Sequence, residues 1–300
     1  MTTQAAIKLF APAKINLLLA VLGLREDGYH ELMTIMHQVS LADIVHLELT
    51  GEPGINLHTT NPQLADDDSN LAFQAAARYL ELIQSSGGLN LLIEKMIPLG
   101  AGLAGGSADA AAVLQGLNQL HAGRLSPGQL HDLAITLGSD VPFCLQGGTA
   151  LAGGRGEVLT PLEVAGWPHL VMVKPPVQVA TAAIYREWDR RGNDDSPAPT
   201  TMISSLQSGD WLQVAKLLYN GLEPITVALV PQVEYVRQRL LERGAEGAMM
   251  SGSGPTVFGL FASPELAEQA YLQFRDEYKE CYLVTSFHRQ PTGYNDGGEA

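Results

Sequence analysis

The most constraining feature of this chain is a run of small residues between a predicted strand and a predicted helix. Residues 98–109 read PLGAGLAGGSAD and contain four glycines. The preceding residues, 89–95, form a predicted strand, and the following residues are alanine-rich with Val113, Leu114 and Leu117 at helical spacing. Glycine allows positive φ and close approach of a ligand to the backbone. A strand–loop–helix of this kind directs free N–H groups and the positive end of a helix dipole at one point, which favours an anion, most commonly a nucleotide phosphate.

The loop alone does not identify the ligand. It lacks the Gly-Lys-Ser/Thr of a Walker A motif, and its glycine spacing does not fit the dinucleotide-binding fingerprint. Ser107, at the junction of loop and helix, is expected to cap the helix, or to bind a phosphate or its magnesium ion. A plain flexible turn before a helix remains the structural alternative. Three other segments, distant in sequence, are needed to decide between these interpretations.

The first of these segments is a predicted strand over residues 7–24, interrupted by Pro12. Strand alternation places Lys14, Asn16 and Leu18 on one face, and the intervening residues on the other. One interpretation is an edge strand with a solvated lysine. The other is a cation and an amide that face a site.

The second segment is a turn at residues 25–28 followed by Tyr29 and His30. A tyrosine and a histidine in this position can stack on a base and read its edge. The alternative is a surface turn with a half-buried aromatic side chain.

The third segment is residues 137–143, LGSDVPF, in which Asp140 enters an apolar stretch. A buried carboxylate is costly unless it has a partner. Asp140 is therefore a candidate general base or magnesium ligand, with a helix cap as the alternative. Ser69 or one of the aspartates at 66–68 is expected to cap the helix predicted from residue 71, which explains this acidic run better than a metal site does.

The second half of the chain contains another glycine–serine loop, SGSGPT at residues 251–256. It is either a hairpin turn or a brace for the first loop. Helices are predicted over residues 181–188, 210–222, 231–243 and 264–278, and strands over 170–174 and 281–288. The polar residues 190–200 are predicted to form a mobile loop and residues 291–300 a disordered tail.

Composition excludes several classes of function. The net charge of −14 argues against nucleic acid and anionic membranes as partners. No run of about eighteen apolar residues is present, and no leader peptide is recognised at the start, so a cytoplasmic location is expected. Cys144 and Cys281 lack metal-ligand spacing and are expected to be reduced core residues.

Taken together, the segments resemble the GHMP kinase superfamily. The motifs APAKINL (11–17), GLAGGS (102–107), LGSDVPF (137–143) and SGSGPT (251–256) occur in the order found in that superfamily. With REDGYHEL at 25–32, the chain most resembles the family of kinases that act on 4-diphosphocytidyl-2-C-methyl-D-erythritol. The resemblance covers about residues 7–290.

The resemblance implies an α+β, GHMP kinase-like fold of two domains. Residues 1–160 are expected to form a domain similar to the second domain of ribosomal protein S5, and residues 161–290 a ferredoxin-like domain. The implied activity is ATP-dependent phosphorylation of the 2-hydroxyl of the cytidylated methylerythritol, in the non-mevalonate pathway of isoprenoid precursor biosynthesis. ATP and Mg²⁺ are the implied cofactors, and a monomer or weak homodimer is expected.

The resemblance also assigns residues. Lys14 and Asp140 match the catalytic pair, Tyr29 and His30 the cytidine-binding pair, and Asn16 a residue of the substrate pocket. Tyr185 matches a second aromatic residue stacked on the cytosine. ATP is expected at Pro98, Leu99, Gly100, Ala101, Gly102, Leu103, Ala104, Gly105, Gly106, Ser107 and Ala108. The sequence departs from the usual loop at Ala104 and Ala108, where Gly and Ser are frequent, so a role for a second serine hydroxyl is in question. No side chain is assigned as a metal ligand.

Two alternatives of different kinds stay open at this point. One is another small-molecule kinase of the superfamily, acting on homoserine, a mevalonate derivative or a sugar, against which Tyr29 and His30 argue. The other is a nucleotide-binding relative without catalytic activity, against which the presence of both Lys14 and Asp140 argues.

Overall fold

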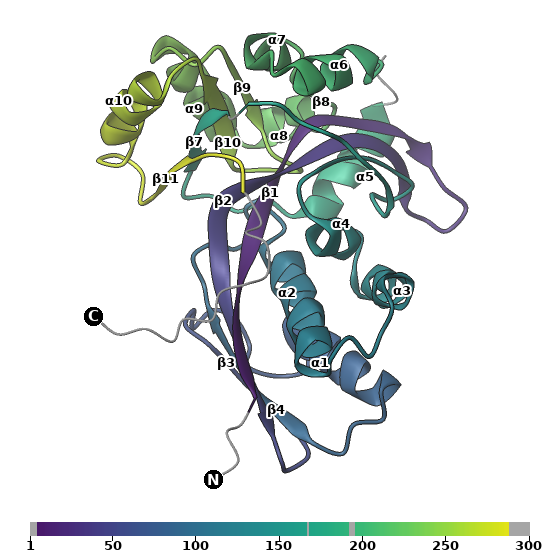
Figure 1. The fold of residues 1–300 in the computed structure, drawn as a ribbon. Helices are drawn as coiled ribbons and strands as arrows, with labels where there is room; N and C mark the ends of the chain where they lie inside the picture. Colours follow the sequence, from purple (N-terminus) through teal and green to yellow (C-terminus); the bar gives the residue numbers. More distant parts are fainter. Residues whose placement is uncertain (1–4, 167, 192–195, 288–300) are drawn as a thin grey trace.

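A computed structural model describes residues 5–166, 168–191 and 196–287. In this part of the chain, helices pack on two β-sheets (Figure 1). The larger sheet has seven strands. Its main path runs β3 (Ile55–Thr59), β4 (Gly88–Glu94), β2 (His30–Thr50), β1 (Ala6–Leu24) and β8 (Tyr219–Asn220). Strand β5 (Thr149–Gly153) pairs with β2, and β6 (Val158–Pro161) pairs with β5.

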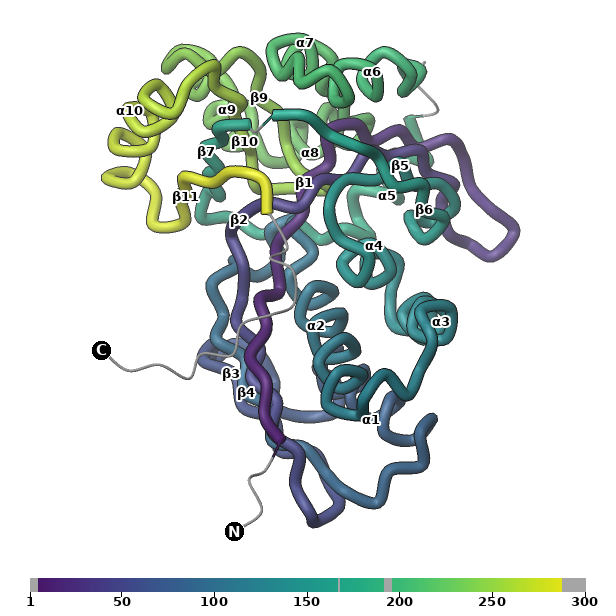
Figure 2. The backbone as a smooth tube through the Cα atoms, viewed as in Figure 1, coloured from purple at the N-terminus to yellow at the C-terminus, as the bar shows by residue number. Residues whose placement is uncertain are grey.

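The two long strands β1 and β2 form one antiparallel hairpin that runs through most of the molecule (Figure 2). At one end the hairpin belongs to the sheet that carries β3 and β4. At the other end it pairs with β5 and β8, which come much later in the sequence. The hairpin therefore carries residues from the first forty positions to the place where the two halves of the chain meet.

Helices α1 (Leu71–Leu82), α2 (Gly105–Leu120) and α3 (Pro127–Leu137) lie on one face of the hairpin and its neighbours, followed by the short α4 (Val141–Gln146) (Figure 1). Helix α2 packs closest to the sheet. A Cβ atom at Gly116 would lie 2.4 Å from Leu47 and 2.6 Å from Leu9, so glycine at this position permits the close approach. This packing fixes the start of α2, and with it the small-residue loop.

The second sheet has the order β11 (Glu280–Val284), β7 (His169–Lys174), β10 (Val257–Phe261) and β9 (Gly247–Met250). Helices α9 (Gln232–Glu242) and α10 (Pro264–Phe274) pack on it. Between β7 and α9 the chain forms α5 (Thr181–Arg191), α6 (Thr200–Ser208), α7 (Trp211–Lys216), β8 and α8 (Glu223–Leu229). One hydrophobic core joins the two sheets, because Ile15 and Leu17 of β1 belong to the same buried cluster as Met172 of β7 and Phe258 of β10.

Most of the predicted elements are confirmed, including the strand before the glycine loop and the helix after it. One element prediction was wrong. Residues 210–222 are not a single helix, because α7 ends at Lys216 and Tyr219–Asn220 pairs in parallel with β1. Pairing with an existing strand satisfies backbone groups that local helical periodicity did not account for.

Two predictions about local geometry also need correction. The cap of α1 is Asn70, which accepts a hydrogen bond from the Ala72 N–H, and not Ser69 or one of the aspartates before it. In β1, irregular register between Asn16 and Leu18 breaks the simple alternation. As a result Leu19, and not Leu18, shares the cavity face with Lys14 and Asn16, while Leu18 is buried in the core.

The remaining predictions about organisation have mixed outcomes. Both cysteines are buried thiols, as expected. None of the helices in the described residues combines the length and the hydrophobicity needed to span a bilayer. Part of the predicted mobile loop (192–195) and the predicted tail (291–300) lie outside the described residues. Arg190 and Arg191, predicted as loop, extend α5. The domain boundary near residue 160 stays a prediction.

Candidate functional site

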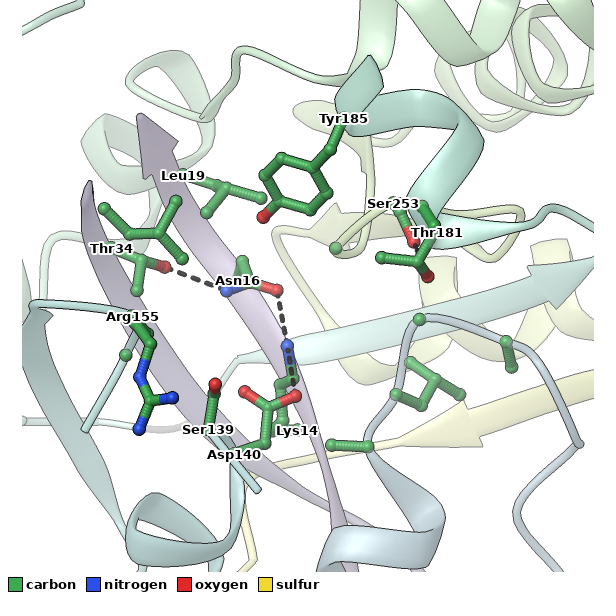
Figure 3. A pocket seen from close by; sticks show the side chains of 18 of the residues that line it. Lys14, Asn16, Leu19, Thr34, Ser139, Asp140, Arg155, Thr181, Tyr185 and Ser253 are labelled. Atoms are coloured by element: carbon green, nitrogen blue, oxygen red, sulfur yellow. Dashed lines mark hydrogen bonds and ion pairs between the residues drawn. The ribbon is translucent and has the colours of Figure 1, made fainter. Parts of the chain in front are cut away.

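A cavity of about 820 Å³ lies where the hairpin, the glycine loop and the second half of the chain meet. It brings together every segment singled out in the sequence. The lining includes Lys14, Asn16, Tyr29, His30, residues 97–106, Ser139, Asp140, Arg155, Thr181, Tyr185, Gly252 and Ser253. Figure 3 shows several of these side chains pointing into one space from different elements.

The glycine loop connects β4 to α2 with several residues in the left-handed region. Gly100 and Gly102 have φ of 59° and 75°, and Ala104, which precedes α2, has φ of 58°. Ala104 has no side-chain acceptor, so the first N–H groups of α2 have no side-chain cap. Ser107 does not cap the helix, as one interpretation of the sequence had it, because α2 begins two residues earlier, at Gly105. The open N-terminus and the backbone turn together form an anion-binding geometry.

The second glycine–serine loop is both a hairpin and a brace. It joins β9 to β10, and the Ser251 hydroxyl donates to the Gly102 carbonyl across 3.0 Å. A Cβ at Gly102 would lie 2.3 Å from the Ser251 carbonyl oxygen, so the two loops are in direct backbone contact. Asn220 holds the second loop from behind, because its amide donates to the Met250 and Gly252 carbonyls at 2.8 Å each.

Lys14 and Asp140 meet inside the cavity. The Lys14 Nζ lies 3.6 Å from the Asp140 Oδ2 and donates to the Asn16 Oδ1 at 2.9 Å. The Asn16 amide in turn donates to the Thr34 Oγ1 at 2.8 Å, and Thr34 donates to the Leu18 carbonyl. This chain fixes the ammonium group between an amide and a carboxylate (Figure 3). The solvated-lysine interpretation is wrong, since the Lys14 side chain is only 7% exposed.

Asp140 occupies the residue before α4, yet its side chain makes no capping hydrogen bond. The helix-cap alternative is therefore wrong for this carboxylate. About a third of the Asp140 side chain is exposed, and this residue lines the same cavity as the glycine loop. The carboxylate is thus free to accept a proton from a group that enters the cavity.

The aromatic end of the cavity is built from the hairpin turn and α5. The Tyr29 ring is half exposed, with the Arg155 guanidinium 4.6 Å from its centroid. The His30 ring lies 4.7 Å from the Tyr185 ring, and its Nε2 donates to the Asp189 Oδ1 across 2.7 Å. Burial, with a smaller contribution from Asp140, raises the pKa of the Tyr185 hydroxyl, which therefore stays neutral.

Several polar residues of the cavity were not predicted. Thr34 and Ser139 line it, as do Arg155, Thr181 and Ser253, whose hydroxyl is 2.8 Å from that of Thr181. Thr34 could be inferred only once the β1–β2 register was known, because it is opposite Leu19 in that pairing. Arg155 has a local signal in the sequence, because it is a cation inside the glycine-rich turn GGRG at residues 153–156.

The cavity has protein groups that fit the phosphates of ATP, but it has no cluster of side chains for Mg²⁺ among the described residues. The open helix N-terminus and the glycine backbone fit a triphosphate. For the metal, no group of three or more His, Cys, Asp or Glu side chains that could hold an ion occurs in the described residues. Mg²⁺ binds nucleotides mainly through phosphate oxygens and water, so a dedicated protein cage is not required.

Comparison with known proteins finds matching family models and similar proteins. Residues 70–148 match the model of the GHMP kinases N terminal domain, and residues 202–280 match the GHMP kinases C terminal model. A protein of Syntrophomonas wolfei named 4-diphosphocytidyl-2-C-methyl-D-erythritol kinase is 42% identical, over 94% of this chain and 98% of the relative. A protein of Alkaliphilus metalliredigens with the same name is 43% identical, over 95% and 98%.

A solved structure agrees with these relatives. The crystal structure of a 4-(cytidine 5'-diphospho)-2C-methyl-D-erythritol kinase superposes with a TM-score of 0.81 at 37% identity, and the match covers 94% of this chain and all of the other. The α+β, GHMP kinase-like fold expected from the sequence is therefore confirmed.

Proposed function

The chain belongs to the 4-diphosphocytidyl-2-C-methyl-D-erythritol kinase family of the GHMP kinases, and we propose that the cavity around Lys14 and Asp140 is its active site. The protein is an enzyme, a kinase that uses ATP as phosphate donor and acts on this small molecule. The observation that supports this proposal most strongly is the distance of 3.6 Å between the Lys14 Nζ and the Asp140 Oδ2, in a cavity that the glycine loop also lines. The 2-hydroxyl of the methylerythritol unit is the proposed acceptor, which gives the 2-phosphate and ADP.

In the proposed mechanism, Asp140 is the general base. The pKa of the acceptor alcohol lies far above neutral pH, so the hydroxyl does not lose its proton unaided. A positioned carboxylate therefore assists removal of the proton as the bond to phosphorus forms. The proton passes to an Asp140 oxygen, the P–O bond to the acceptor forms, and the bond between the γ-phosphorus and ADP breaks. Lys14 stabilises the negative charge that develops on the transferred group.

Asn16 and Thr34 position Lys14 in this scheme. A lysine side chain has several rotatable bonds, and a single acceptor leaves it mobile. Two fixed acceptors, the Asn16 amide oxygen and the Asp140 carboxylate, restrict the ammonium group to one place. Such positioning supplies much of the rate in phosphoryl transfer, because little covalent chemistry falls to the protein.

We assign the triphosphate of ATP to residues 98–108. The N–H groups at the start of α2 and the loop backbone would hold its oxygens, and Mg²⁺ would accompany the phosphates to neutralise charge during transfer. The Ala108 side chain is buried in the core and carries no hydroxyl, so it contributes no side-chain ligand to the phosphates or the metal. At the far end of the cavity, Tyr29, His30 and Tyr185 are the proposed contacts of the cytosine.

The test is an ADP-release assay with purified protein and a panel of alcohols. Rapid turnover is expected with 4-diphosphocytidyl-2-C-methyl-D-erythritol, and none above background with homoserine, mevalonate or a hexose. Preference for another alcohol in the panel would reject the substrate assignment. Nucleotide binding without turnover of any alcohol would support the non-catalytic alternative.

A further inference from the structure

A buried ion cluster lies beneath the glycine loop and has no role in the chemistry described above. It consists of Asp43 from β2, Lys95 after β4, and Asp109 in the first turns of α2. The Lys95 Nζ contacts both carboxylates, with 2.6 Å to the Asp109 Oδ2. All three side chains are at most 4% exposed. The other Asp43 oxygen accepts the N–H groups of Met96 and Ile97, at the start of the loop.

The cluster touches both ends of the loop that is proposed to hold the triphosphate. Asp43 fixes the residues that enter the loop, and Asp109 lies one helical turn into the helix that leaves it. Lys95 lines the cavity, and a Cβ at Gly105 would lie only 3.5 Å from its Nζ. The cluster therefore supports the proposed phosphate-binding loop from beneath, at both of its ends.

The charges of the cluster do not balance. Two carboxylates share one ammonium group, and the Asp109 Oδ1 is a buried oxygen with no hydrogen-bond partner among the described residues. Such an oxygen is costly in its ionised form. The charged groups that face Asp109 are Lys95 and Asp43. The Cys144 thiol of α4 is also near, because its pKa is raised mainly by burial and to a smaller extent by Asp109.

We propose that Asp109 is a positioning residue for the nucleotide. Through Lys95 it holds the phosphate-binding loop in place, and its carboxylate takes up a proton when a triphosphate binds to that loop. This inference rests on the proposed assignment of ATP to residues 98–108. The proton comes from the buffer and returns to it when the nucleotide leaves. No bond other than that O–H bond is made or broken in the linkage.

The physical reason is electrostatic. Burial raises the pKa of Asp109 to about 7, with Asp43 adding to the rise and Lys95 opposing it. The carboxyl is therefore poised near neutrality before the ligand arrives. A triphosphate bound at the start of α2 adds negative charge close to Asp109, which favours its neutral form further. Lys95 remains charged, because the two carboxylates raise its pKa despite burial.

The experiment is isothermal titration of ATP with excess Mg²⁺, in the absence of the alcohol substrate, at pH 7.5 in buffers of different ionisation enthalpy. If binding raises the pKa of Asp109 by about one unit, the full-length enzyme takes up about half a proton per ATP. Its affinity for ATP should also weaken by about tenfold between pH 6 and pH 9. Asp109→Asn keeps an oxygen for Lys95 but cannot titrate, so both effects should disappear while ATP still binds.

Glu223→Gln is the matched control. Glu223 is another buried carboxyl with a pKa raised to about 7 by burial, but it lies at the start of α8 and accepts the Met250 N–H. This variant should keep the proton uptake of the wild type. Equal uptake in the wild type and Asp109→Asn would overturn the inference and leave the proposed function standing, whereas failure of the wild type to bind ATP would overturn the proposed function.

A second comparison covers the case in which Asp109→Asn does not fold. Adenosine has no phosphate, so the wild-type enzyme should bind it without the uptake seen for ATP. Equal proton uptake with adenosine and ATP would overturn the inference as well.

Discussion

The side chain on which the proposed chemistry depends most directly is Asp140. In Asp140→Ala the acceptor alcohol loses its base, while the glycine loop and its brace are untouched. We expect the turnover number to fall by about a hundredfold or more, with little change in the dissociation constant for ATP. Steady-state kinetics and equilibrium nucleotide binding measure the two quantities separately.

The control for this variant is Asp132→Asn, which removes an exposed carboxylate on α3, outside the cavity. It should behave as the wild type. Turnover within a few-fold of normal in Asp140→Ala would contradict the assignment of the base and leave Lys14 without its proposed catalytic partner.

Tyr29 is the residue proposed to stack on the cytosine. Its ring is half exposed and carries the Arg155 guanidinium on one face, so the other face remains available to a base. Tyr29→Ala should raise the KM for the cytidylated substrate by about five- to tenfold, because a stacked aromatic pair is lost. The KM for ATP should not change.

Tyr235 offers a matched control for Tyr29. It is exposed to a similar degree and has the Arg239 guanidinium 5.4 Å from its ring, but it lies on α9 away from the cavity. Tyr235→Ala should leave both Michaelis constants unaltered. If the KM for the cytidylated substrate is also unaltered in Tyr29→Ala, the stacking role is refuted.

At the scale of elements, the strand–loop–helix at residues 88–120 could be predicted from sequence because its signals are local. Small residues, strand alternation and helical periodicity all act within a few positions. The bulge in β1 could not be predicted, since it depends on pairing with β2. Because of the bulge, Leu19 lines the cavity in place of Leu18, which simple alternation predicted. The same reason explains why β8 was predicted as helix, because only its pairing with β1 makes it a strand.

The candidate site shows the same division. Lys14, Asp140 and the loop lie in motifs and were predicted to come together, and the structure places them around one cavity. The Asp43–Lys95–Asp109 cluster had no such signal, because its three members come from separate elements and each alone is an ordinary charged residue. Contacts of this kind become visible only when the fold is known.

The contact between the two glycine loops gives a prediction at this scale. Gly102 has φ of 75°, and any side chain there would collide with the Ser251 carbonyl. Gly102→Ala should lower the free energy of unfolding by about 2–4 kcal/mol and raise the KM for ATP, since the loops must separate. Chemical denaturation and kinetics would measure both effects.

Gly123→Ala is a control that separates the strain of a positive φ from the collision with the Ser251 carbonyl. Gly123 has the same φ of 75°, but no atom lies within 4 Å of the Cβ position. This control should lose only about 1–2 kcal/mol of stability and keep the KM for ATP. Equal effects of the two substitutions would show that the loop contact has no special role.

For the molecule as a whole, the buried Glu223 predicts a dependence of stability on pH. Its pKa is raised by burial from 4.5 to about 7, so the folded state binds its proton more tightly than the unfolded state. The resulting stabilisation is fully present below pH 4.5 and is lost as the pH rises through 7. Glu223→Gln stays neutral and keeps an acceptor for Met250, so it should be more stable than the wild type at pH 8, by up to about 3 kcal/mol, and similar at pH 4.5.

Urea denaturation of both proteins at the two pH values tests this prediction. Glu277 provides a control of opposite sign, because its ion pair with Arg239 lowers the pKa of that carboxyl. Glu277→Gln should be no more stable than the wild type at pH 8. A stability difference between Glu223→Gln and the wild type that is the same at pH 4.5 and pH 8 would contradict the linkage.

The shared core leads to a prediction about the two domains expected from the sequence. A cut at residue 160 would remove Met172 and Phe258 from the buried cluster that they share with Ile15 and Leu17 of β1, and would also remove β8 from the edge of the larger sheet. Each large apolar side chain that loses its burial costs about 1.5–3 kcal/mol, and several are affected at once, which exceeds the net stability of most domains. We therefore expect a fragment of residues 1–160 to lack a cooperative thermal transition by circular dichroism, whereas the full chain shows one. A folded fragment with a sharp transition would mean that the hairpin β1–β2 carries enough core on its own, and that the second half of the chain docks onto a preformed domain.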